Sequence, residues 1–111
     1  MRFDVPGLQP EAVSCAPLFT NHGLVLLYIA RQPGGRERDI AAAVGITERS
    51  AQRIVGDLVA SGYITRYRSG RRNVYDIVGE TAITDPIARG TRVRDFVQLA
   101  GREPEQQRLP A

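Results

Sequence analysis

The chain has 111 residues, 42% hydrophobic and 24% charged, which suits one globular domain with a modest core. All of its 15 basic residues are arginines, against 12 acidic residues, and the net charge is +3. Arginine presents a planar fork of donors that suits phosphate groups and guanine edges. A GC-rich genome would also favour arginine over lysine, so the composition alone does not indicate a function. The positions of the arginines along the chain are more informative.

Several function classes are disfavoured. The longest apolar run, residues 24–30, is far shorter than the roughly 20 residues of a membrane span, and no secretory signal opens the chain. The single cysteine, Cys15, excludes an intrachain disulfide framework, and its role stays open between packing and redox sensing. Cys15 and His22 do not make a metal site, and we take His22 as structural or solvated. We expect a cytoplasmic protein.

No catalytic constellation is visible. The chain has no glycine-rich phosphate loop, no nucleophile beside a base and no carboxylate pair at useful spacing. We therefore predict that the protein is not an enzyme and uses no cofactor.

The N-terminal half predicts an arm and three helices. Residues 1–19 hold three prolines and one glycine and read as an N-terminal arm. Thr20 or Asn21 can cap the first helix, which the Pro33-Gly-Gly segment ends. A short helix over residues 37–44 ends at Gly45, and the next helix covers residues 47–61. Helix, sharp turn and helix form a helix-turn-helix.

The rest of the chain predicts a hairpin and a last helix. Strands over residues 63–68 and 74–78 flank a tight turn, with Tyr75 and Ile77 pointing inward. Tyr63 and Tyr67 are also expected on the inner face. Thr91 can cap a helix that ends near residue 100, and the polar tail 102–111 is expected to be disordered. The fold class is mainly α with a small β-hairpin (α+β), a winged helix-turn-helix of three core helices, a wing and a C-terminal helix.

Four regions follow from this pattern. They are the arm 1–19, a winged helix-turn-helix DNA-binding domain over 20–78, a C-terminal segment and helix over 79–101 with a dimerisation role, and the tail 102–111.

The helix over residues 47–61 has one apolar face and one face suited to contact. Helical periodicity places Ala51, Ile54, Val55 and Leu58 together. Opposite them lie Arg49 and Arg53 near the N-terminus and the small residues Gly56 and Ala60 further along. Thr47 can cap this helix and Glu48 suits its positive end, while Ser50 and Gln52 flank the arginines.

The hairpin carries a concentrated positive charge. Residues 63–76 contain four arginines and one acidic residue, Asp76. The arginines are Arg66, Arg68, Arg71 and Arg72. Two adjacent arginines near Gly70 and Asn73, the predicted positive-φ turn residues, contribute nothing to a core. They suit a phosphate or a narrow minor groove, although charge also protects exposed sheet edges from aggregation.

Residues 39–58 resemble the helix-turn-helix of bacterial winged-helix regulators. Ala41 is the small residue where the helices touch, and Gly45 makes the turn. The continuation through residues 62–64 into an arginine-tipped wing resembles MarR-type and ArsR-type transcription factors. The resemblance implies a sequence-selective regulator of double-stranded DNA, with helix 47–61 in the major groove and the wing on the backbone or minor groove. The predicted DNA-binding residues are Thr47, Glu48, Arg49, Ser50, Gln52, Arg53, Arg66, Arg68, Arg71, Arg72 and Asn73.

A homodimer is expected, and two alternative functions stay open. The predicted dimer surface lies on the first and last helices and comprises Leu24, Tyr28, Val93, Phe96, Val97 and Leu99. One alternative is a protein-interaction adaptor that uses the surface around Gly56 and Ala60. The other is a sensor gated by an unknown small-molecule effector or by oxidation of Cys15.

Overall fold

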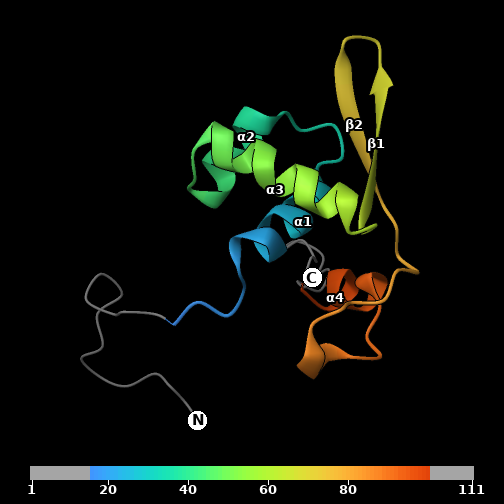
Figure 1. The fold of residues 1–111 in the computed structure, drawn as a ribbon. Helices are drawn as coiled ribbons and strands as arrows, with labels where there is room; N and C mark the ends of the chain where they lie inside the picture. Colours follow the sequence, from blue (N-terminus) through green and yellow to red (C-terminus); the bar gives the residue numbers. More distant parts are fainter. Residues whose placement is uncertain (1–15, 101–111) are drawn as a thin grey trace, which may run out of the picture.

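A computed structural model of the protein describes residues 16–100. Cys15, the arm before it and the tail 102–111 lie outside the described residues. The described part contains four α-helices and one antiparallel hairpin (Figure 1). In chain order these elements are α1 (Asn21–Arg31), α2 (Glu37–Val44), α3 (Glu48–Ala60), β1 (Ile64–Ser69), β2 (Arg72–Ile77), the 3-10 turn η2 (Pro86–Ala88) and α4 (Val93–Ala100). The predicted fold class is thereby confirmed.

Side-chain caps start the helices α1 and α3. The Thr20 hydroxyl accepts a hydrogen bond from the Gly23 N–H at 3.1 Å and starts α1. Thr47 does the same for α3, accepting from the Ser50 N–H at 3.0 Å. These bonds satisfy amides that have no partner inside the helix. Both predicted caps are confirmed.

Gly45 makes the turn between α2 and α3. It adopts the left-handed conformation, with φ 87°, and its N–H donates to the Ala41 carbonyl at 2.8 Å. Only glycine reaches this conformation without a steric penalty on Cβ, so the helix stops here and the chain reverses. Ala41 is 5% exposed, because its small side chain lies where the helices meet.

The hairpin pairs Ile64 with Ile77 and Ser69 with Arg72, so its turn consists of Gly70 and Arg71 alone. The predicted turn was longer: Asn73 lies within β2 and, like every described non-glycine residue, has no positive φ. Gly70 has φ 66°, and glycine at the first turn position is typical of tight hairpins.

The inner face of the hairpin is only partly as expected. Tyr75 is 1% exposed and Ile64 is also buried. Tyr67, however, is 48% exposed, because its register partner is Val74 and this pair lies on the opposite face from the pair of Arg66 and Tyr75. The expectation that Tyr67 points inward is therefore wrong.

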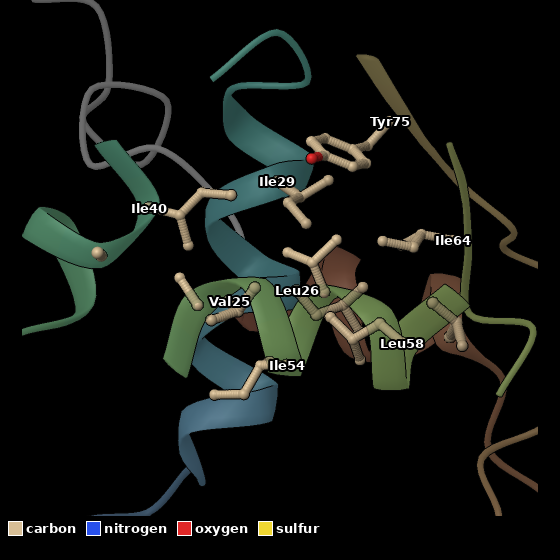
Figure 2. Close-up of a cluster of buried hydrophobic side chains, with 12 residues drawn as sticks. Val25, Leu26, Ile29, Ile40, Ile54, Leu58, Ile64 and Tyr75 are labelled. Atoms are coloured by element: carbon tan, nitrogen blue, oxygen red, sulfur yellow. The ribbon is translucent and has the colours of Figure 1, made fainter. Parts of the chain in front are cut away.

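The core lies where α1 crosses the other elements (Figure 2). Side chains of α1 lie between those of α2, α3 and the hairpin, and the figure shows Ile29 close to the ring of Tyr75. The buried residues of this cluster are Val25, Leu26, Ile29, Ile40, Ala41, Ala51, Ile54, Val55, Leu58, Ile64, Tyr75 and Val93. The cluster fixes α3 by its apolar face and leaves its opposite face exposed.

The last helix docks on the same core. The N–H groups of Val93 and Arg94 donate to the carbonyls of Thr81 and Gly79 at 2.9 and 3.0 Å. The helix begins after Arg92, whose N–H donates to the Asp95 carboxylate at 3.0 Å, so the prediction that Thr91 caps it is wrong. The sequence signal for this start was the acid three residues on, as in a capping box.

Candidate nucleic-acid interface

The outward face of α3 is open and basic. Arg49, Gln52 and Arg53 are exposed and Ser50 is half-buried. A Cβ added at Gly56 would meet no other atom within 4 Å, so the helix backbone itself is accessible at that point. A helix with two arginines followed by a bare backbone can approach a broad, grooved surface closely.

The α3 N-terminus adds a positive end to this face. Thr47 and Glu48 are exposed, and Glu48 lies in the first helical turn. The free amides of a first turn and the helix dipole attract anionic groups. Thr47 uses its hydroxyl on the Ser50 amide, so the cap fixes the end of α3 and only the remaining amides are available to a ligand.

Arg53 and Arg49 differ in their local partners. Arg53 Nη1 lies 3.7 Å from Asp57 Oδ2, one helical turn away. Among residues 16–100, Arg49 makes no ion pair or hydrogen bond through its side chain. Asp57 also faces His22, whose Nε2 lies 2.8 Å from the same Oδ2. His22, taken from the sequence as structural or solvated, is 42% exposed, and the fold brings a carboxylate of α3 against it, a contact that the sequence did not predict.

The four arginines of the wing do not act as one cluster. By register, Arg66 and Arg68 share the face of the hairpin that carries Tyr75 and Asn73, whereas Arg72 lies on the opposite face. The Arg72 guanidinium donates to the Gly34 carbonyl in the loop between α1 and α2. Arg71 is exposed in the turn, at the end of the hairpin that projects from the helices (Figure 1).

Arg66 lies near the hydroxyl of Tyr75. Burial raises the pKa of that phenol, and the negative charge of Glu37 raises it further. Arg66 opposes both effects by its charge and by hydrogen bonding, and Asn73 does so by hydrogen bonding. Arg66 and Asn73 therefore both interact inside the protein, and Arg68 and Arg71 are the wing cations without a side-chain partner among residues 16–100.

A small basic hollow connects the wing to α2. It has a volume of about 220 Å³ and lies against the α2 N-terminus. Three arginines (Arg36, Arg71 and Arg72) and one acid (Glu37) contribute to its walls. The hollow extends the positive surface from the wing tip toward the helix-turn-helix.

A larger cavity of about 520 Å³ lies against α1 and the C-terminal end of α3. It is lined by both polar and aromatic groups, among them Phe19, His22, Asp57, Tyr63 and Phe96. Phe19 and Phe96 meet edge to face, with ring centroids 5.6 Å apart. Asp57, which faces both His22 and Arg53, therefore also lines this cavity, and the size of the cavity suits a small molecule.

The residues predicted for a dimer surface separate in the structure. Val93 is completely buried in the core of its own chain, which removes it from such a surface. Tyr28, Phe96 and Val97 are half-buried and pack against that core. Leu99 is 83% exposed and Leu24 is half-buried, so within this set Leu99 alone presents a large apolar side chain to solvent.

The described part of the chain shows neither a metal-binding cluster nor a membrane-spanning helix. Residues 16–100 contain no group of three or more His, Cys, Asp or Glu side chains placed to hold a metal ion. In the same part of the chain, no helix has the length and apolar character that crossing a membrane requires.

Comparison with known proteins identifies the winged-helix segment. Residues 19–72, from the residue before the α1 cap to the start of β2, match the model of the MarR family. The resemblance to bacterial winged helix-turn-helix regulators is thereby confirmed over these residues, and it is of the MarR type. The family is one of transcription regulators and not of enzymes. No curated protein matches the sequence.

Two solved structures are similar to this chain. One is MepR, a transcription regulator of the Staphylococcus aureus multidrug efflux pump MepA, at 22% identity and a TM-score of 0.49, covering 71% of this chain and 52% of that one. The other is the PcaV transcriptional regulator from Streptomyces coelicolor in complex with its natural ligand, at 20% identity and a TM-score of 0.48, covering 80% and 66%. The chain therefore spans between about half and two thirds of the length of these proteins.

Proposed function

We propose, from the MarR-type fold of residues 19–72, that this protein is a sequence-selective regulator that binds double-stranded DNA as a homodimer. The main support for this proposal is the composition and exposure of the outward face of α3. It combines two exposed arginines with an accessible helix backbone at Gly56, and the rest of the helix is anchored in the core. A helix of this kind fits the major groove, where arginine recognises guanine through two parallel hydrogen bonds.

Each part of the surface then has its own role. Arg49 and Arg53 read guanine edges, and Ser50 and Gln52 assist at neighbouring bases or phosphates. Thr47 and Glu48 shape the α3 N-terminus, where the free amides bind a phosphate. These roles assign base specificity to α3 and leave the strength of non-specific binding to the wing.

In the wing, Arg68 and Arg71 are the main phosphate or minor-groove contacts. They have no side-chain partners among the described residues, and Arg71 occupies the projecting turn. The side chains of Arg66, Arg72 and Asn73 already have partners in the protein, so these residues are secondary contacts along the strands of the hairpin. The basic hollow beside Arg36 offers a further place for a backbone phosphate.

The proposal is tested by selecting bound sequences from a random duplex pool and titrating the selected duplex at several salt concentrations. We expect a defined sequence and a log–log salt dependence with a negative slope, since bound phosphates release counterions. Arg53→Ala should lower affinity for the selected duplex by about 1–3 kcal/mol and relax the preference at one base pair. The absence of binding at low salt would contradict the proposal, and a co-purifying protein would then point to an adaptor that uses the Gly56–Ala60 surface.

The homodimer rests on apolar side chains that one chain leaves uncovered. Leu99 on α4 is 83% exposed, and Ile87 in η2 is 100% exposed. Dimeric regulators bind two half-sites, so the selected sequence should be an inverted repeat with half-sites about one helical turn apart. A single asymmetric site bound by one copy would contradict the dimer.

A second candidate is gating by a small molecule, and the 520 Å³ cavity favours it. Such a ligand would lie against α1 and the C-terminal end of α3, next to the helix that we propose to read DNA. Metabolites should be screened by thermal shift on the wild type and on Ala88→Trp, which fills the cavity from η2. A ligand of the cavity stabilises the wild type only, whereas equal stabilisation of both would place the binding elsewhere.

A further inference from the structure

One carboxylate oxygen joins α1 to the exposed face of α3. Asp57 Oδ2 lies 2.8 Å from His22 Nε2 and 3.7 Å from Arg53 Nη1. The exposed fractions of the His22, Asp57 and Arg53 side chains are 42%, 51% and 64%. Since a carboxylate only accepts hydrogen bonds, His22 Nε2 carries the hydrogen and donates it. The three side chains thus form a chain of contacts from the core helix to an arginine that faces solvent.

These contacts do little for stability. Ion pairs between half-exposed side chains are screened by water, and holding long side chains in one geometry costs conformational entropy. They do restrict direction, however. Arg53 has a flexible stem and a planar fork, and bidentate recognition of guanine requires that fork to have one orientation. A carboxylate one turn along the helix reduces the orientations that the fork can take.

We propose that Asp57 is a positioning residue for base recognition: it orients the Arg53 guanidinium, and His22 holds the Asp57 carboxylate in place. The inference rests on the proposed DNA-binding function and deepens it, because it names a residue that sets specificity without contacting DNA. His22 supplies the firmer of the two contacts at 2.8 Å, so the position of the carboxylate is set from α1 and passed on to Arg53.

The test compares two duplexes, the selected sequence and the same sequence with the Arg53-dependent base pair replaced. The ratio of their dissociation constants is measured for the wild type, Asp57→Asn and Arg53→Ala, and for Asp57→Asn combined with Arg53→Ala. We expect Asp57→Asn to lower the ratio about fivefold, comparable to the lower end of what a bidentate arginine–guanine pair contributes. In the Arg53→Ala background, Asp57→Asn should leave the ratio unchanged.

His22 is tested with a matched pair of variants. His22→Leu removes the donor and should lower the ratio as Asp57→Asn does. His22→Gln keeps an N–H that can donate to the carboxylate, and should retain most of the discrimination. Asp85→Asn controls for the loss of one negative charge outside α3, and should leave the ratio unchanged. Unfolding temperatures of all variants check that the fold is intact, which the exposure of the three side chains predicts.

The outcomes separate this inference from the function on which it rests. If the wild type discriminates through Arg53 but Asp57→Asn keeps the full ratio, the positioning role is wrong and the regulator proposal stands. If Asp57→Asn lowers the ratio equally in the Arg53→Ala background, Asp57 acts independently of Arg53 and the inference is again overturned. If the wild type binds duplex DNA without any base preference, both the proposed function and this inference fail.

Discussion

The backbone N–H of Tyr75 donates to the Pro33 carbonyl at 3.1 Å and attaches the wing to the loop that follows α1. The Tyr75 ring is almost completely buried below this contact and packs into the core cluster. β2 therefore holds the wing to the helices through a backbone bond, an aromatic side chain and the Arg72 contact to Gly34. β1 adds Ile64 to the core, but the rest of that strand is exposed.

The burial of Tyr75 predicts a large loss of stability on its removal. Tyr75→Ala should lower the free energy of unfolding by about 3–5 kcal/mol, because it leaves a cavity at the junction of α1 and the hairpin. Tyr67→Ala is the matched control in β1, and should cost less than about 1 kcal/mol, since Tyr67 is 48% exposed. Urea denaturation measures both, and equal losses would show that the ring of Tyr75 does not support the core.

Tyr75 also predicts a loss of stability at alkaline pH. Its pKa in the folded protein is raised by burial, while an unfolded tyrosine titrates at its ordinary value of 10.0. The stabilising contribution is complete below that value and is lost as pH rises toward the raised folded pKa, because only the unfolded chain ionises there. Urea midpoints between pH 8 and 11 should therefore fall more steeply for the wild type than for Tyr75→Phe. Parallel profiles would assign the loss to other groups.

Two glycines predict opposite effects of the same substitution. Gly45→Ala should destabilise the protein by about 1–2 kcal/mol, because φ 87° is unfavourable for any residue with a Cβ. Gly56→Ala should stabilise it by about 0.5–1 kcal/mol, because Gly56 lies inside α3 with open space around it. Thermal unfolding of the two variants provides the comparison. Both positions have no atom within 4 Å of an added Cβ, so differences in packing do not confuse the result.

The exposed face of α4 predicts how the proposed dimer responds to charge. Leu99→Glu should shift the sedimentation of the protein toward the monomer and leave the helical circular dichroism of the folded chain unchanged, because Leu99 is 83% exposed within one chain. Arg38→Glu, which changes charge at an exposed position of α2, should leave the oligomer unchanged. A dimer that survives Leu99→Glu would place its interface on another surface.

Arg68 and Arg71, the wing arginines that have no side-chain partner within residues 16–100, predict a change in salt dependence. Replacing Arg68 and Arg71 by Gln should weaken binding to all duplexes alike and reduce the slope of log affinity against log salt by about 1 for each lost phosphate contact. Arg31→Gln near the C-terminal end of α1 is a comparison outside the wing, and should leave the slope unchanged. An unaltered slope in the Arg68 and Arg71 variant would show that the wing does not contact the DNA backbone.

Short-range chemistry in the sequence was enough to predict the elements. Thr20 and Thr47 cap helices through amides three residues away, and Gly45 makes its turn with φ 87°. The apolar spacing of α3 predicts which face is buried, because helical periodicity depends only on neighbours. The predicted cap of α4 was wrong because two adjacent residues could start this helix. Threonine is a common capping residue, so the sequence favoured Thr91, but the helix begins after Arg92, whose amide donates to the Asp95 carboxylate.

The candidate site depends on contacts that no local pattern contains. His22 and Asp57 are 35 residues apart, and Arg72 and the Gly34 carbonyl that it contacts are 38 apart, so these contacts form only because α1 packs against α3 and β2. Composition and spacing by themselves determined that this chain forms a helix-turn-helix with a basic hairpin. Tertiary packing decided which arginines keep their charge available and which are held by partners in the protein, because a side chain's neighbours in space are set by how the helices cross.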